Sequence, residues 1–269
     1  MLSTISRWLT IVLVALYAVL GIALFVLPGR LSAVFAWNVS PFVTMTIGGW
    51  CLGNAWAALV AVRRWQWAQV YPILIYLWLF GILELLIVFI FRDKLRLEHP
   101  IAWLYLLTLV VNVLAAVWGV MDLLRLRPAW STPGRRVTPL IRFMIIFFVL
   151  FVGFLGFYGL FAGEGWPGTN GGIFPEVMSP FTLRSFGAFY LALALAAATL
   201  WITLRFESFL PFIYAEFGLI VAITLAAIWN IRLFDFAGRP GGLAYIGVYL
   251  IVGAATLILM LIYGTRDVA

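Results

Sequence analysis

The sequence predicts an all-α, polytopic membrane protein with eight transmembrane helices arranged as two parallel four-helix repeats. Three observations support this prediction. Apolar residues make up 65% of the 269 residues and charged residues only 10%, a composition typical of chains that lie in a bilayer. Eight apolar segments are long enough to span it, and the second half of the chain repeats the order of the first. Strict two-residue alternation, which would indicate an outer-membrane barrel, is absent from the sequence.

A spanning helix needs about 20 apolar residues to cross about 30 Å of hydrocarbon. Eight segments meet this requirement: 8–27, 41–62, 67–91, 100–124, 143–161, 180–204, 209–233 and 241–263. The first segment follows Arg7 and has some features of a secretion signal. Its apolar run is longer than the roughly 7 to 15 residues of a signal core, so we expect it to remain as a helix.

The repeat is visible in the tripeptide Ser-Pro-Phe, which occurs at 40–42 and again at 179–181, an offset of 139 residues. Arg7 and Ile11 match Arg142 and Ile146 at an offset of 135, and Tyr105 matches Tyr245 at 140. An offset that drifts by only five residues indicates a tandem duplication. We therefore expect a first repeat at 1–127, an Arg/Pro-rich cytoplasmic linker at 128–141 and a second repeat at 142–269. Each repeat has an even number of spans, so both should cross the membrane in the same direction.

The arginines predict the orientation. The region 123–162 contains five arginines and no acid, whereas 163–179 contains two glutamates and no basic residue. The positive-inside rule therefore places the linker and both termini in the cytoplasm, although the basic residues at 92–96 fall on the outer side. We expect the bacterial inner (cytoplasmic) membrane. The net charge of +7 then reflects topology, and nucleic acid is not a predicted partner. Predicted partners are membrane lipids, with partner membrane proteins or a homo-oligomer left open.

Small residues recur every four positions in the second predicted helix and at the aligned positions of the sixth. They are Gly49, Gly53 and Ala57, aligned with Ala188, Ala192 and Ala196. Small residues at this spacing allow two backbones to approach closely in lipid. The alternative is that glycine and alanine are simply common in spanning helices. We predict that these two helices pack together at the interface between the repeats.

Charges inside the bilayer indicate functional sites, because each costs at least about 2.5 kcal/mol unless it is paired or hydrated. Glu84, Arg184 and Glu216 lie in the third, sixth and seventh predicted helices. We hypothesise that Glu84 and Arg184 form an ion pair across the repeat interface. In the alternative, Arg184 extends to the outer headgroups, and Glu84 is protonated or bonded to a tyrosine or asparagine.

Glu216 is the second candidate centre. Its expected polar neighbours are Tyr214, Asn54, Asn112 and Asn230. Such a carboxyl could load a proton or bind a cation, or it could be a satisfied packing contact. The candidate ligand-binding or coupling set is therefore Glu216, Glu84, Arg184, Asn54, Asn112 and Tyr214. The segment 31–39, with Phe35 and Trp37, is expected to form a short helix at the outer surface.

No cofactor is predicted. One histidine and one cysteine cannot assemble a usual zinc site or bis-histidine haem ligation, although a bound lipid or quinone is compatible with the sequence. No catalytic residue is assigned, because no nucleophile, base and orienting group stand out together.

The stretch 179–190 resembles the start of the second helix in bacterial DoxX-like membrane proteins, most of which are uncharacterised. The resemblance depends on Arg184, Gly187 and Tyr190, whereas the first copy has Met45 and Cys51 in place of the arginine and the tyrosine. It implies a four-helix unit for each repeat. Some DoxX-like proteins are described as subunits of quinone-linked oxidoreductases, but the resemblance brings no catalytic residue to this chain.

Three functions remain open. The first is a pseudo-symmetric binding or transport protein for a small molecule or lipid, with its site between the repeats. The second is a non-catalytic subunit or scaffold of a larger membrane complex, with a solidly packed bundle. The third, a membrane enzyme, would need a polar cluster at the outer mouth, such as Glu164, Glu176, Asp235 and Arg239. We favour the first, because the buried charges differ between the copies.

Overall fold

The computed structural model describes residues 1–131, 134–161, 163, 176–238 and 241–264, and the structural statements below refer to these. Eight helices within this part of the chain are long and apolar enough to cross a membrane. This confirms the predicted all-α class and indicates an integral membrane protein. The helices are α1 (Thr4–Val26), α3 (Pro41–Arg64), α4 (Trp67–Ile90), α5 (Pro100–Leu126), α6 (Pro139–Phe161), α7 (Pro180–Thr199), α8 (Phe206–Trp229) and α9 (Gly241–Tyr263). A short helix, α2 (Pro28–Leu31), follows α1.

The repeated Ser-Pro-Phe tripeptide starts α3 and α7 in the same way. The side chain of Ser40 accepts a hydrogen bond from the backbone amide of Val43, and that of Ser179 accepts one from Thr182. The proline that follows each serine occupies the first turn, where a missing amide hydrogen costs nothing. The tripeptide is therefore a helix start signal in both halves of the chain.

The connection between α7 and α8 differs from the expected one. α7 ends at Thr199 and continues as a short 3₁₀ turn, so the helix is shorter than the predicted segment 180–204. Leu204 then adopts a left-handed conformation with a φ of 53°. The amide of Val137 donates to the carbonyl of Leu204, and the amide of Phe206 donates to that of Arg135. These bonds attach the segment before α6 to the start of α8.

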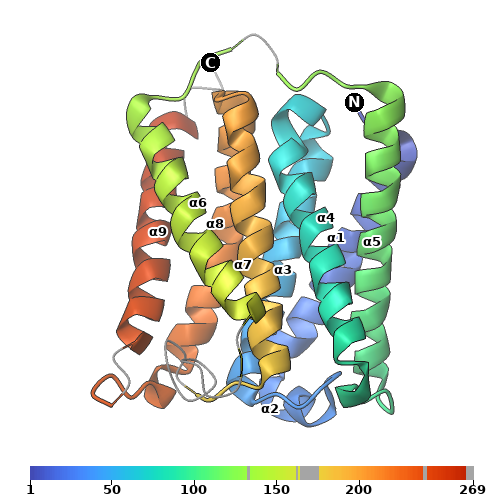
Figure 1. Cartoon of the computed structure of the whole chain (residues 1–269), viewed down its shortest axis with the longest axis vertical. Helices are drawn as coiled ribbons and strands as arrows, with labels where there is room; N and C mark the ends of the chain where they lie inside the picture. Colours follow the sequence, from blue (N-terminus) through green and yellow to red (C-terminus); the bar gives the residue numbers. More distant parts are fainter. Residues whose placement is uncertain (132–133, 162, 164–175, 239–240, 265–269) are drawn as a thin grey trace.

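The eight helices form one bundle in which α1, α3, α4 and α5 lie on one side and α6 to α9 on the other (Figure 1). We call these the amino-terminal and carboxy-terminal halves. The two halves meet where α3 packs along α8 and where α4 packs along α7 and α8. Within the amino-terminal half α1 packs along both α3 and α5. Within the carboxy-terminal half α6 packs along α7 and α8 packs along α9, but α6 does not pack along α9.

Gly49 and Gly53 of the predicted small-residue stripe contact α8, and α3 packs along α8 and not along α7. A Cβ atom on Gly53 would lie 2.7 Å from the Cα of Leu219, and one on Gly49 would lie 3.2 Å from the backbone of Ala222. Between α3 and α7, Trp50 stacks on Phe189 with ring centroids 4.9 Å apart. Aromatic side chains therefore occupy the space where we expected the backbones of α3 and α7 to meet. The remaining members of the set, all buried, are Ala57, Ala188, Ala192 and Ala196.

Aligned glycines make the close contacts inside each half. A Cβ atom on Gly21 of α1 would lie 2.8 Å from the backbone nitrogen of Leu52 on α3. The aligned Gly156 of α6 would place its Cβ 2.4 Å from the nitrogen of Leu191 on α7. Close approach of these helix pairs therefore depends on glycine in both halves.

The segment 31–39 does not form the expected surface helix. α2 ends at Leu31, a 3₁₀ turn covers Ser32–Val34, and Phe35 and Trp37 are buried. The Trp37 ring stacks on Phe181 at 4.3 Å, and its Nε1 donates to the hydroxyl of Thr182 at 3.1 Å. These contacts join the two halves at the end of the bundle where α7 begins.

Candidate functional site

The amino-terminal half has a buried polar interior. Asn112 on α5 donates from Nδ2 to the hydroxyl of Tyr17 on α1 at 2.6 Å. Tyr76 on α4 donates from its hydroxyl to Oδ1 of Asn54 on α3, also at 2.6 Å. All four side chains are buried. Asn54 and Asn112 therefore connect helices within this half and do not surround Glu216 as expected.

Glu84 and Arg184 do not form the hypothesised ion pair. Glu84 is fully buried and accepts a 2.6 Å hydrogen bond from the hydroxyl of Tyr105. The Arg184 guanidinium instead lies over the ring of Phe91, 5.0 Å from its centroid, where the ring face attracts the positive charge. The alternative in which Glu84 bonds to a tyrosine agrees with this geometry.

The other expected neighbours of Glu216 also have different partners. The carbonyl of Tyr214 accepts from Nε1 of Trp56 at 2.8 Å, and Arg64 lies over the Tyr214 ring. Asn230 donates to the carbonyl of Ala226 at 2.8 Å. Among the hydrogen bonds of the described residues, none joins Asn54, Asn112, Tyr214 or Asn230 to Glu216.

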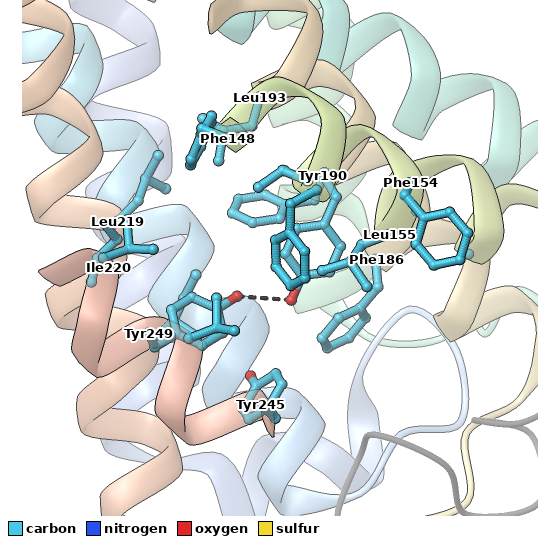
Figure 2. Close-up of a pocket in the computed structure, with 18 of the residues that line it drawn as sticks. Phe148, Phe154, Leu155, Phe186, Tyr190, Leu193, Leu219, Ile220, Tyr245 and Tyr249 are labelled. Carbon is cyan, nitrogen blue, oxygen red and sulfur yellow. Dashed lines mark hydrogen bonds between the residues drawn. The ribbon is translucent and has the colours of Figure 1, made fainter. Parts of the chain in front are cut away.

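A pocket of about 420 Å³ lies inside the carboxy-terminal half, among α6, α7, α8 and α9. Figure 2 shows Phe148, Phe154 and Tyr190 on one side of it and Ile220 and Tyr249 on the other. Its walls are almost entirely apolar. We expected a site between the repeats, whereas this pocket lies within one half, and Glu216 is the only member of the predicted set that lines it.

Two kinds of polar side chain line the pocket. The hydroxyl oxygens of Tyr190 on α7 and Tyr249 on α9 are 2.8 Å apart and share a hydrogen bond (Figure 2). Glu216 on α8 is 4% exposed, and its Oε1 atom has no hydrogen-bond partner among the described residues. Tyr190 and Tyr249 therefore satisfy each other, while Oε1 of Glu216 is left without a hydrogen bond within the described part of the chain.

Part of the pocket lining aligns in sequence with polar residues buried in the other half. Three residues of that polar interior and the buried Glu84 align with four apolar lining residues: Tyr17 with Val152, Asn54 with Leu193, Asn112 with Val252 and Glu84 with Ile223. In the amino-terminal half, the bond between Tyr17 and Asn112 joins α1 to α5. Two valines cannot form such a bond and are shorter, so they leave space between α6 and α9.

Sequence reasoning missed the tyrosine pair and Asp122. Tyr190 and Tyr249 align with Cys51 and Leu109. The presence of a tyrosine in only one half could therefore have identified both residues as candidates. Asp122, near the end of α5, accepts from the backbone amide of Ser3 at 2.9 Å and from the hydroxyls of Ser3 and Ser6. These bonds attach the start of α1 to α5, and the signal was an acid inside an apolar segment.

The described members of the proposed outer polar cluster have separate partners. Glu176 accepts a hydrogen bond from the Ser40 hydroxyl, and Asp235 accepts one from the amide of Gly238 at 2.9 Å. Burial raises the pKa of Glu176, and the bond from Ser40 opposes part of that rise. Glu164 and Arg239 lie outside the described residues.

Comparison with protein-family models, with curated proteins and with solved structures found no match to this chain.

Proposed function

We propose that this protein binds a lipid-soluble small molecule in the pocket among α6, α7, α8 and α9. The observation that carries the proposal is an apolar pocket of about 420 Å³ inside an apolar bundle, a volume within the range of about 300 to 1,000 Å³ that is usual for small-molecule sites. Phe154 lines the pocket and is 67% exposed, so the pocket reaches the outer face of the bundle. A ligand would enter sideways from the bilayer, between α6 and α9.

The proposal keeps the binding function favoured by the sequence and moves its site into the carboxy-terminal half. Transport would require the pocket to have a second opening in addition to the one between α6 and α9. We also propose that the two halves arose by duplication and that both termini face the cytoplasm. The like contacts of Gly21 and Gly156 support the duplication, and the arginines of 123–142 support the orientation.

An apolar photolabel tests the proposal in the intact protein. The protein would be reconstituted in lipid nanodiscs with a straight-chain alkane that carries a diazirine, and the labelled residues would be mapped by mass spectrometry. Val248 lines the pocket, whereas Ala254 is an exposed residue of the same helix outside it. Val248→Trp should fill the pocket and lower labelling of its walls several-fold, and Ala254→Trp should leave that labelling unchanged.

Two results would overturn the proposal. One is labelling spread evenly over the exposed faces of α6 and α9, with no effect of Val248→Trp. The other is a stoichiometric partner protein that covers α6 and α9 in native mass spectrometry while the pocket remains unlabelled. That second result would favour the scaffold function, since the exposed faces of Phe147 and Ile251 would then contact protein.

A further inference from the structure

Glu216 stands out among the pocket residues because it is a buried carboxyl group to which no other described residue donates a hydrogen bond. The side chain is 4% exposed, and Oε1 has no hydrogen-bond partner among the described residues. The neighbouring wall is apolar, with Leu219 and Ile220 on the same helix. The aligned position in the amino-terminal half is Leu77. The packing of a helix at this position is therefore compatible with leucine, and the carboxyl group is an addition specific to the pocket.

A buried polar group without a partner is costly, more so in a bundle surrounded by hydrocarbon, and native proteins rarely leave one unsatisfied. Among the described residues, no tyrosine of the pocket bonds to Oε1 of Glu216. Tyr190 and Tyr249 bond to each other, and the ring of Tyr214, two residues from Glu216, lies under Arg64 and not in the pocket wall. The space beside Glu216 is the pocket itself, so a bound molecule can complete its hydrogen bonding.

We propose that the pocket selects a long-chain alcohol, a molecule whose hydroxyl group bonds to Glu216 while its hydrocarbon chain fills the apolar walls. This inference rests on the proposed binding function and names the chemical class of its ligand. A hydroxyl group both donates and accepts, so it matches a carboxyl group in either protonation state. An ether oxygen only accepts, and a hydrocarbon does neither. The pocket should therefore discriminate between these three classes.

The position of Glu216 adds a requirement on the ligand. Glu216 is the eleventh residue of α8, about 15 Å from the start of the helix at 1.5 Å per residue and about 20 Å from its end. The carboxyl group is thus near the middle of the span and away from both headgroup regions. A ligand must carry its hydroxyl into the hydrocarbon layer, which favours a single polar group on a mostly apolar molecule over a charged phospholipid headgroup.

The experiment compares three diazirine probes of equal chain length: an alcohol, its methyl ether and the alkane. Each would be photolabelled to the wild-type protein, Glu216→Gln and Glu216→Leu in nanodiscs, in competition with an unlabelled alcohol, to obtain apparent affinities. One hydrogen bond corresponds to about a tenfold preference for the alcohol over the ether. Glu216→Gln keeps an accepting oxygen and a donating amide, so it should keep most of the preference. Glu216→Leu should abolish the preference and bind the alkane at least as well as the wild type does.

The alkane separates failure of this inference from failure of the proposed function. If the alkane labels the pocket and the wild type does not distinguish alcohol from ether, the role of Glu216 is wrong and the binding function stands. A preference that persists in Glu216→Leu would also overturn it, because another group would then hold the hydroxyl. If no probe labels the pocket of the wild type, the binding function itself fails, and this inference fails with it.

Discussion

Replacing Gly53 with alanine should destabilise the contact between the two halves and alter the pocket. Gly53 lies on α3, and Leu219 of α8 lies directly against it. Leu219 also lines the pocket on its other side. A side chain added at Gly53 therefore displaces Leu219, which lies between the α3–α8 contact and the pocket.

The size of the effect follows from the distances. A Cβ atom at position 53 would lie 2.3 Å from Cδ2 of Leu219 and 2.7 Å from its Cα, whereas carbon atoms in favourable contact are about 3.5 to 4.0 Å apart. The side chain of Leu219 can rotate away, but its Cα moves only if α8 moves. Overpacking of this kind typically costs about 1 to 3 kcal/mol. Gly153 of α6 is the matched control, because its added Cβ would meet Ala194 at an ordinary 3.6 Å.

The assay is the free energy of unfolding in bicelles, measured together with alkane photolabelling of the pocket. Gly53→Ala should lose about 1 to 3 kcal/mol and show lower pocket labelling, while Gly153→Ala should stay within about 0.5 kcal/mol of the wild type. If Gly53→Ala were as stable as Gly153→Ala, α3 would not pack against α8 through this glycine. The inferred link between the half–half contact and the pocket would then be wrong.

Three further predictions concern single side chains. Burial raises the pKa of Glu176, so the folded chain binds that proton more tightly than the unfolded chain does, and this contribution to stability is lost as the pH rises through the raised pKa. Glu176→Gln should therefore reduce the loss of unfolding free energy as the pH rises above the ordinary glutamate pKa of about 4.3, and an unchanged slope would contradict the assignment. Asp122→Ala removes the acceptor of the Ser3 and Ser6 bonds and should speed hydrogen exchange in the first turn of α1; wild-type protection there would show that Asp122 does not hold it. Tyr105→Phe leaves Glu84 without its hydrogen bond and should cost about 1 to 3 kcal/mol of unfolding free energy, a cost that a stability equal to the wild type would exclude.

Local chemistry made the helices predictable. Helix formation across a bilayer needs only a long apolar run, because the backbone has no water to bond to. The serines and prolines at 40–41 and 179–180 start α3 and α7 where the sequence indicates. The ends were less predictable. The predicted segment 180–204 extends beyond the end of α7, because Leu204 adopts a left-handed conformation and bonds to the segment before α6. A pattern of neighbouring residues cannot predict this contact, because it joins residues far apart in the sequence.

The candidate site was only partly predictable. Glu216 was identified because a carboxyl group is rare inside an apolar segment, and it does line the pocket. Its surroundings were predicted wrongly, since Asn54 and Asn112 bond to tyrosines of the amino-terminal half. The sequence shows that the two halves differ at aligned positions, such as Asn112 and Val252. This difference indicates a pocket only once both residues are known to face the interior of their halves.

The sequence by itself determined the number of spanning helices, their approximate bounds and the rare polar groups within them, because each depends on the residues of one segment. Only the tertiary structure decided which helices are neighbours. It places α3 along α8 and buries Trp37 against Phe181, and it does not pack α6 along α9. The physical reason is that nearly every face of these helices is apolar. In lipid, hydrophobicity does not select one apolar face over another, so the arrangement depends on shape, glycine contacts and a few hydrogen bonds between residues far apart in the sequence.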